Sequence, residues 1–565
     1  TQAHISLTNF VTAIEDSAFE ISKNVVISCT TKQSNIRTIK TRAFYSAQNI
    51  YIGNLLTTIE TIEPYSFGYI SVASLNTTFL HLQSIPSYAF YGSRRIGSIT
   101  LEVATSISSY AFTSSDLNSI NIGSSLRSLE LNAFPEAHPY FKGSGPSYSC
   151  IDGFLFQSTT LLLAPSSYNG NKTAIPTITT AIADYAFCNC EFPDSNLVYT
   201  IPSGVSSIGS HAFYRFQGKY PYGKNVKFFI LGQASISDYA FGYCGASIIE
   251  IPSATSLGSY AFAHCEITSL QIPATMRTID SKAFGFCRIT YFSIAGTSSY
   301  FTVQNNNLYT ANGQTLLMYA YQYNTSYSVP NSIRTINSYA FQNSQLRSII
   351  FEPTNYINLS PYLFYGLANL ASVSLPNCLS SIGEYFFYSC SNLRSITLPN
   401  SSLTIIGDFA FSRCSYLNSV VIPNTVRTIG HHAFSSCTYL SSITLPDTVT
   451  TIGDYAFFYC IRLSSITFPR NLRTLGNHAF EESSLSSSST INVSGAISIL
   501  PHCCFNSSSI RKVAILANIN TLSSYAFYDC TALTTVTLPS SLTNIEEFAF
   551  YSCKSLTTIN FPNNL

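Results

Sequence analysis

One phrase recurs along the whole chain: an aliphatic residue, three variable residues, usually an alanine, and then a phenylalanine. It reads IGDYAF from Ile452 to Phe457, and the residue five before the phenylalanine is Ile or Leu in all twenty-one copies, most often 23 residues apart. A unit this short cannot bury its apolar face alone, so the repeat predicts a solenoid of stacked coils. The anchor phenylalanines are Phe19, Phe44, Phe67, Phe90, Phe112, Phe134, Phe187, Phe213, Phe241, Phe262, Phe284, Phe341, Phe364, Phe387, Phe411, Phe434, Phe457, Phe480, Phe505, Phe527 and Phe550.

Each unit contains a short alternating segment, such as SITLP in LRSITLPNSSLTIIGDFAFSRC. Alternation predicts a strand in which Ile396 and Leu398 point inward and Ser395 and Thr397 point outward. Pro399 is expected to end the strand, because proline has no N–H to donate to a ladder.

The residue three before the anchor is Ser, Thr, Asp or Asn in fourteen of the twenty-one copies, for example Asp408 and Asp454. These residues are preferred helix N-caps, because a side-chain oxygen accepts from unpaired N–H groups at a helix start. The pattern therefore predicts one short helical turn in each coil, after the strand.

Two gaps interrupt the spacing. The sixth and seventh anchors are 53 residues apart and the eleventh and twelfth 57, which exceeds a 23-residue repeat by 30 and 34. Asn312-Gly313 in the second gap is a hairpin turn signal, so we expect each insert to be a β-hairpin that projects from the stack. The expected organisation is one continuous solenoid with a block of six coils in 1–134, a hairpin in 135–175, five coils in 176–295, a hairpin in 296–328 and ten coils in 329–565.

The motif LxxIxLPxxxxxIGxxAFxxC and the insert pattern GxLYxxxxxTLL resemble the BspA-type leucine-rich repeats, over essentially the whole chain. The resemblance implies a curved solenoid with a parallel sheet on its concave face and cell-surface roles in adhesion and host-protein binding. With the residue patterns above, the expected fold is a leucine-rich-repeat solenoid of about 21–23 coils of ~23 residues, with short helical turns opposite the sheet.

Charged residues make up 10% of the chain and the net charge is +1. This balance does not favour nucleic acid or an anionic membrane as a partner. No apolar run approaches the roughly 18 residues that cross a bilayer, so we expect no membrane span. No GxSxG-like elbow or comparable motif supports catalysis. We therefore expect no enzyme, no catalytic residue and no cofactor.

Sixteen cysteines are present, and ten of them lie three residues after an anchor. Stacked coils point equivalent side chains in parallel, which opposes disulfides between neighbours. We expect a ladder of buried free thiols, and no metal site, because Cys188/Cys190 and Cys503/Cys504 lack a second pair at zinc-ligand spacing. The ten cysteines are Cys190, Cys244, Cys265, Cys287, Cys390, Cys414, Cys437, Cys460, Cys530 and Cys553.

Tyrosine is the common residue two before the anchor, and His211, His432 and His478 replace it in three coils. We expect these side chains to stack on one another along a flank; a stripe that contacts a partner is the alternative. Seven sites match the N-glycosylation pattern and are candidate acceptors: Asn76, Asn171, Asn324, Asn358, Asn400, Asn492 and Asn506.

The outward strand positions of the last block are the candidate binding surface. The first position, which we call the outward column, consists of Ser374, Thr397, Val421, Thr444, Thr467, Asn492, Ala514, Thr537 and Asn560. The parallel column two residues earlier consists of Ser372, Ser395, Ser419, Ser442, Ser465, Thr490, Lys512, Thr535 and Thr558. Such a face is either a solvated sheet of strand-forming residues or a low-charge surface for a protein partner.

The leading hypothesis is a non-enzymatic protein-recognition or adhesion solenoid at the cell surface or outside the cell, with a host protein or a second copy as partner. The alternative is an intracellular structural scaffold, cytoplasmic or cytoskeletal, packed into a larger assembly. Unpaired thiols fit the alternative, because they are commoner in reducing compartments. The inserts are the alternative recognition element.

Overall fold

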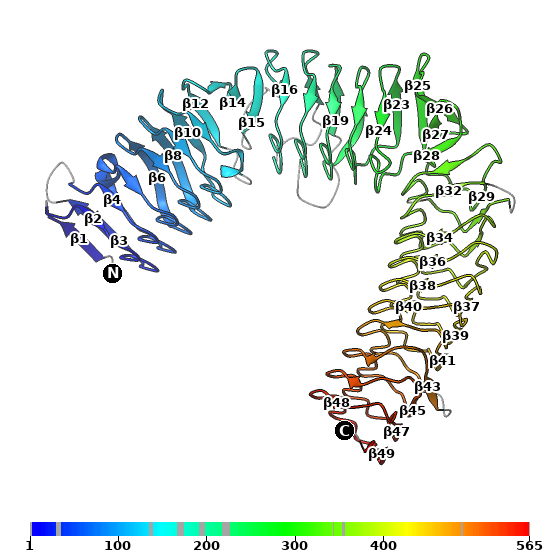
Figure 1. Ribbon diagram of the computed structural model, residues 1–565. Coiled ribbons are helices and arrows are strands. Elements are labelled where there is room, and N and C mark those ends of the chain that lie inside the picture. The colour runs from blue at the N-terminus through cyan, green and yellow to red at the C-terminus, as the bar shows by residue number, and fades with distance from the viewer. Residues whose placement is uncertain are drawn as a thin grey trace. The chain divides into compact units, whose positions relative to one another are not determined.

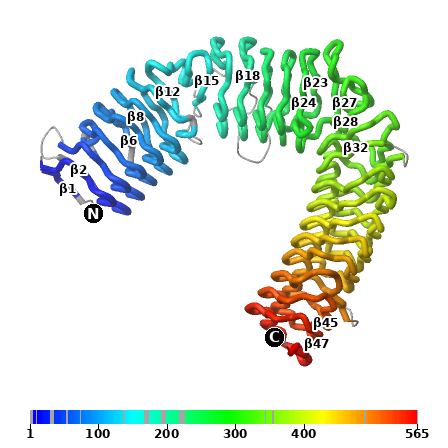
Figure 2. The backbone as a smooth tube through the Cα atoms, in the orientation of Figure 1, coloured from blue at the N-terminus to red at the C-terminus, as the bar shows by residue number. Residues whose placement is uncertain are grey.

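The computed structural model describes residues 3–8, 10–29, 35–134, 139–165, 174–190, 198–216, 226–342, 344–352, 356–486, 490–563 and 565. Two compact units are present, the first formed by residues 1–287 and 295–298 and the second by 288–294 and 299–565. Within each unit, successive coils lie side by side and repeat the same path (Figures 1 and 2). The expected solenoid is therefore confirmed.

Each regular coil carries two strands, where the sequence predicted one. The coil of Phe434 has β37 (Ser419–Val421) and β38 (Thr428–Ile429), with six residues between them. In β37 the central Val420 is buried between exposed Ser419 and Val421, so the expected alternation is confirmed. The second strand buries Ile429, the aliphatic residue five before the anchor. Two parallel ladders therefore follow the stack.

In the first unit, the strands of the first ladder are β1 (Ala3–Leu7), β3 (Val25–Cys29), β6 (Ser71–Phe79), β8 (Arg94–Leu101), β10 (Ser119–Ile122), β12 (Tyr140–Gly143), β17 (Val198–Ile201), β19 (Val226–Ile230), β21 (Ala246–Glu250) and β23 (Ser269–Pro273). The second ladder contains β2 (Ala13–Ile14), β4 (Thr38–Ile39), β5 (Thr61–Ile62), β7 (Ser84–Ile85), β9 (Ser106–Ile107), β11 (Ser128–Leu129), β16 (Ala181–Ile182), β18 (Ser207–Ile208), β20 (Ser235–Ile236), β22 (Ser256–Leu257) and β24 (Thr278–Ile279). Two short 3₁₀ segments, η1 (Gly53–Thr58) and η2 (Leu131–Ala133), are the helical elements of the described chain.

In the second unit, the first ladder contains β25 (Tyr291–Ala295), β29 (Ser326–Ser328), β31 (Ser348–Ile350), β33 (Ser372–Ser374), β35 (Ser395–Ile396), β37, β39 (Ser442–Thr444), β41 (Ser465–Thr467), β43 (Ile491–Val493), β45 (Lys512–Ile515), β47 (Thr535–Thr537) and β49 (Thr558–Asn560). The second contains β30 (Thr335–Ile336), β32 (Asn358–Leu359), β34 (Ser381–Ile382), β36 (Ile405–Ile406), β38, β40 (Thr451–Ile452), β42 (Thr474–Leu475), β44 (Ile499–Leu500), β46 (Thr521–Leu522) and β48 (Asn544–Ile545).

The inserts form antiparallel strands that belong to the stack. In the first unit β13 (Ser149–Ile151), β14 (Phe154–Gln157) and β15 (Thr160–Leu163) pair antiparallel, and β15 then pairs parallel with β16. In the second, β26 (Phe301–Gln304), β27 (Asn307–Thr310) and β28 (Thr315–Met318) do the same and β28 joins β30. Hairpins that project from the stack are therefore not confirmed, because these strands extend the second ladder.

The predicted helical turn is wrong. The segment around each anchor is a series of tight turns: in the coil of Phe434, Ala433 N–H donates to Gly430 O and Ser435 N–H to His432 O. His432 has φ of 52°, and Tyr455, at the same position of the next coil, has 56°. A left-handed residue stops an α-helix. Every second N–H group of these turns instead donates to a carbonyl oxygen of the next coil. His432 N–H, for example, donates to Asp454 O at 2.8 Å.

The side chains predicted to be N-caps bond the next coil as well. Asp408 Oδ1 accepts from His431 N–H at 2.7 Å, and Asp454 Oδ1 accepts from Asn477 N–H at 2.8 Å. The coils approach closely here: a Cβ on Gly430 would lie 2.4 Å from Asp408 Oδ1. The sequence thus identified the right residues as acceptors, but their donors lie one coil further along.

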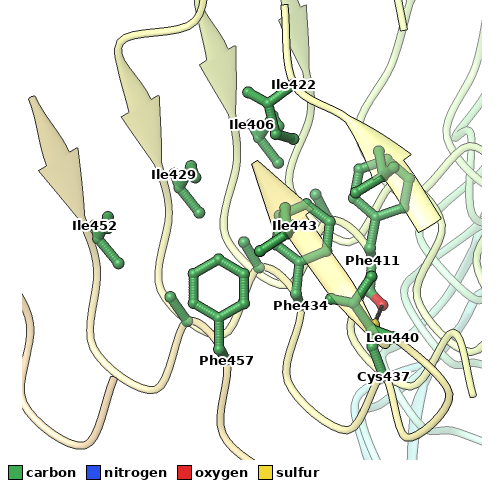
Figure 3. Packing of buried hydrophobic residues seen from close by; sticks show 14 of the residues in the cluster. Ile406, Phe411, Ile422, Ile429, Phe434, Cys437, Leu440, Ile443, Ile452 and Phe457 are labelled. Carbon is green, nitrogen blue, oxygen red and sulfur yellow. Dashed lines mark hydrogen bonds between the residues drawn. The ribbon is translucent and has the colours of Figure 1, made fainter. Parts of the chain in front are cut away.

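Inside the coils the anchor phenylalanines form three runs of neighbouring rings, Phe19 to Phe134, Phe187 to Phe284 and Phe341 to Phe550. Phe434 and Phe457 are fully buried and their ring centroids are 5.5 Å apart with planes 1° apart. Phe457 repeats this with Phe480 at 5.2 Å. Figure 3 shows Phe411, Phe434 and Phe457 in succession, beside the aliphatic residues of the strands. Parallel stacking follows from identical backbone geometry in successive coils.

Candidate functional site

The outward column of the second unit is exposed to solvent along almost its whole length. Ser374, Thr397, Val421, Thr444, Thr467, Asn492, Thr537 and Asn560 are all exposed, and Ala514 is half-buried. Direct pairing places neighbours opposite each other, as for Val421 with Thr444 and Thr444 with Thr467. The structure therefore brings these residues together as a row in two parts, Ser374 to Thr467 and Asn492 to Asn560, with rungs about 4.8 Å apart within each part.

The chemistry of this row is hydroxyl, amide and aliphatic. None of its nine residues is ionisable, and the parallel column has one charge, on Lys512. Val421 has 79% of its surface exposed, and Ile350, which pairs with Ser374, has 42%. Ile350 precedes the column predicted from the sequence, which starts at Ser374, although the same alternation marks it. Val421 and Ile350 thus add aliphatic surface to the hydroxyl and amide groups of the row.

Among the described residues, the row has one interruption in pairing. The first ladder is continuous from β35 to β41 and again from β43 to β49, and the second ladder ends at β42 and resumes at β44. The outward column is thus divided between Thr467 and Asn492. The coils remain bonded at this junction through their turns, for example by Phe480 N–H to Cys504 O at 2.9 Å.

The tyrosine column stacks as expected. Tyr455 lies between His432 and His478, with ring centroids 4.7 and 4.4 Å away and planes within 3° of parallel. Burial lowers the pKa of His432, and the neighbouring His431 lowers it further. His211 stacks on Tyr185 and Tyr239 in the same way. Histidine thus replaces tyrosine as a flat ring.

The cysteine ladder is buried as predicted. Nine of the ten cysteines in register are buried and Cys553 is half-buried, and each of the ten is a thiol outside any disulfide. In the last block each of the six cysteines in register donates its thiol to an anchor carbonyl one coil earlier, as Cys460 Sγ does to Phe434 O at 3.3 Å. Burial raises the pKa of Cys460 and of Cys530 to about 12. These thiols are therefore neutral packing groups, because reactivity needs an accessible thiolate.

The glycosylation candidates differ in accessibility. Five are exposed: Asn76, Asn324, Asn358, Asn400 and Asn492. Asn506 is half-buried and its Nδ2 donates to Glu481 Oε1, so the atom that would carry a sugar is already bonded. Asn171 lies outside the described residues. Asn492 belongs to the outward column, where a sugar would cover the proposed contact surface.

A cluster that the sequence analysis missed lies at the interrupted junction. The ligand atoms of His478, His502 and Cys503 lie within 4.8 Å of one another. His478 is 24 residues from His502, about one coil, so a search for sequence-local zinc spacing does not find the group. Burial and, to a smaller extent, the charge of Glu481 together raise the pKa of Cys503 to about 11.

Six regions of the chain match the model of the BspA type leucine-rich-repeat region: residues 12–140, 166–220, 234–315, 314–439, 393–508 and 498–565. Together they cover most of the sequence. The chain belongs to the BspA-type leucine-rich-repeat family. The repeat anchored on phenylalanine is therefore a leucine-rich repeat, as its motif indicated.

Several solved structures are similar to this BspA-type chain. A protein from Eubacterium ventriosum is 18% identical, with 73% of this chain and 92% of that chain covered and a TM-score of 0.42. The pneumococcal vaccine antigen PcpA is 18% identical, covering 54% and 82%, with a TM-score of 0.39. A leucine rich cell surface protein from Faecalibacterium prausnitzii is 20% identical, covering 57% and 95%, with a TM-score of 0.36.

A comparison with curated protein sequences gives no match. In the part of this BspA-type chain that the structure describes, no helix has the length and apolar character that crossing a bilayer requires.

Proposed function

We propose that this chain is a non-enzymatic protein-recognition solenoid, displayed at a cell surface, that binds a host protein or a second copy of itself through the outward column. The observation that carries the proposal is the exposed, uncharged row from Ser374 to Asn560, with Val421 79% exposed at its most regular part. Membership of the BspA-type family supports a binding role, since such solenoids present extended surfaces.

The composition of the row determines the kind of binding expected. Between Ser395 and Thr467 the four rungs β35, β37, β39 and β41 are in continuous register. Contact with their hydroxyl and aliphatic side chains depends on area and shape, because no ionisable group lies in the outward column to steer a partner. The affinity is therefore expected to change little with salt, since ionic strength screens charged contacts.

The alternative, an intracellular scaffold, is favoured by the free cysteines. Their burial weakens that argument: Cys414, Cys437 and Cys460 are each 0% exposed, so an oxidising medium does not reach them in the folded chain. The thiols therefore fit either compartment. Sugars on Asn400 or Asn358 in protein isolated from its source would favour the surface.

The test is a paired substitution, Thr444→Arg with Thr467→Arg, which places bulk and charge on the outward column without entering the core. Binding is measured against immobilised extracellular-matrix proteins and, for self-association, by sedimentation of the chain alone. The expected result is loss of whichever binding the unmodified chain shows. The matched control is Thr474→Arg with Asn544→Arg, two exposed residues of the second ladder, which leaves binding intact.

The inserts need a separate variant, because deletion of β27 and β28 would remove strands of the ladder itself. Ala311→Arg with Gln314→Arg changes the exposed turn between them and leaves both strands in place. If this turn variant abolishes binding while the Thr444/Thr467 variant retains it, the outward column is not the contact surface. Absence of any binding to the matrix panel or to itself would contradict the proposal as stated.

A further inference from the structure

The cluster of His478, His502 and Cys503 occupies a place where the stacked ring column changes composition. Cys503 lies two residues before its anchor, where the preceding coil has His478 and the following coil has Tyr525. A thiol there leaves no ring between His478 and Tyr525. The imidazole of His502 approaches both edge-on, with centroids 5.4 and 5.5 Å away. One coil thus turns a thiol and an imidazole toward the imidazole of its neighbour.

The surroundings of His478 orient it as a ligand. Its Nδ1 lies 2.7 Å from Glu481 Oε2, which leaves Nε2 available. The other oxygen of Glu481 accepts from Asn506 Nδ2. A carboxylate bonded to the non-ligating nitrogen is the usual outer-shell partner of a metal-bound histidine, because it fixes the tautomer and raises ligand basicity.

We propose that His478, His502 and Cys503 bind one Zn²⁺ ion, with water in the fourth position. Two imidazoles and a thiolate are ligands that zinc favours, at about 2.0–2.1 Å for nitrogen and about 2.3 Å for sulfur. Ligand atoms around such an ion are roughly 3.5 Å apart, so atoms already within 4.8 Å need a small inward movement. Both histidines are partly exposed, which gives the ion access from solvent.

The place of the site indicates its role. His478 follows β42 in one coil, and His502 and Cys503 follow β44 in the next, the coils between which both ladders are interrupted. An ion held by both coils connects them at the junction where strand pairing does not. Zinc is therefore expected to stiffen the stack between β41 and β49, the part that carries half of the outward column. The site itself does not depend on that column's function.

The experiment titrates the intact, metal-stripped chain with ZnCl₂ in a calorimeter. One equivalent is expected to bind. Cys503→Tyr restores the common residue of the ring column and removes the thiol, and His502→Asn removes an imidazole. Each is expected to weaken binding by more than about 100-fold, since loss of a ligand exceeds the 10–100-fold effect of an outer-shell residue. Glu481→Gln removes the outer-shell carboxylate and is expected to weaken zinc binding by the smaller factor of about 10–100.

His432→Tyr is the matched control, because His432 has the same position in its coil as His478 and no cysteine beside it. This variant is expected to bind zinc with the affinity of the unmodified chain. Co²⁺ in place of zinc reports the ligands directly, through a thiolate-to-metal absorption that Cys503→Tyr abolishes. Thermal unfolding confirms that each variant is folded. Zinc affinity that is unchanged in Cys503→Tyr, or no binding by the unmodified chain, would overturn the proposal and leave His502 as packing in place of a missing ring.

Discussion

Cys437 Sγ donates to the carbonyl oxygen of Phe411, the anchor of the preceding coil, at 3.1 Å. Figure 3 shows this bond between the two coils, below the stack of phenylalanine rings. Cys414 and Phe387 repeat it at 3.1 Å. The same carbonyl accepts from Cys414 N–H of its own coil at 3.1 Å, so the thiol adds a second hydrogen bond from the next coil. A small, weakly polar side chain is suited to this position, because it fills the core and uses the second lone pair of a buried carbonyl oxygen.

Stability is expected to fall as pH rises above about 9, more steeply than tyrosine ionisation alone explains. Burial raises the pKa of Cys460 and Cys530 to about 12, against about 8.5 in an unfolded chain. Below pH 8 the thiol is protonated in both states and adds no pH dependence. Between these values only the unfolded chain loses the proton, which costs about 2 kcal/mol per thiol at pH 10.

Urea unfolding at pH 8 and pH 10 measures the effect. The triple variant Cys414→Ala, Cys437→Ala, Cys460→Ala is the control: it is less stable at pH 8, but its stability declines less between the two pH values. An equal decline in both proteins would mean that the thiols do not contribute.

Phe457→Ala is expected to destabilise its own region by about 3–5 kcal/mol, the usual range for emptying a buried aromatic site. The ring is fully buried and stacked on both sides, by Phe434 and Phe480. Because each coil contacts only its neighbours, the damage should stay local. Hydrogen exchange is expected to rise around Phe457 and to stay unchanged around Phe90. An equal rise near Phe90 would contradict coil-by-coil stability.

The sequence was sufficient for the repeat, its core and its outward rows, because those depend on periodicity. Phe457 and Val420 are buried, and Thr444 is exposed, at the positions that the pattern assigns. The sequence did not predict the turn correctly. An aspartate such as Asp454 occupies the same place in the motif whether its carboxylate accepts from an N–H group of its own coil or from one of the next coil. The positive φ of Tyr455 could not be predicted from its residue type, because that conformation is usually adopted by Gly or Asn.

The zinc-ligand cluster shows the same limit for sites. The sequence places Cys503 beside Cys504, whereas the structure places it with His478 of the preceding coil. Proximity in a solenoid follows the repeat length, so ligand sets have to be sought one coil apart. The function of the outward column depends on a partner, which the residues of this chain alone do not name.

Asp408→Ala is expected to destabilise the chain by about 1 kcal/mol, the usual cost of losing a side-chain acceptor for a turn N–H. Asp408 Oδ1 accepts from His431 N–H at 2.7 Å, and the variant leaves that donor to water. Asp408→Asn keeps the oxygen and is expected to lose less. Amide exchange at His431 reports the bond directly, and it should accelerate in the alanine variant only.

At Tyr455 glycine is expected to be tolerated better than alanine, by roughly 1 kcal/mol, the reverse of the usual order in regular structure. Both substitutions remove the ring that stacks on His432 and His478. Only alanine keeps a Cβ in the left-handed conformation, φ 56°, so the difference between the two variants isolates backbone strain from lost stacking. Thr444 in β39 supplies the control, because its extended backbone should make alanine the better of the two there. Thermal unfolding of Tyr455→Gly, Tyr455→Ala, Thr444→Gly and Thr444→Ala shows which of the two residues is more stable at each position. If alanine is the more stable residue at both positions, the turn does not hold Tyr455 at positive φ in solution, and a helical turn would have to be considered again.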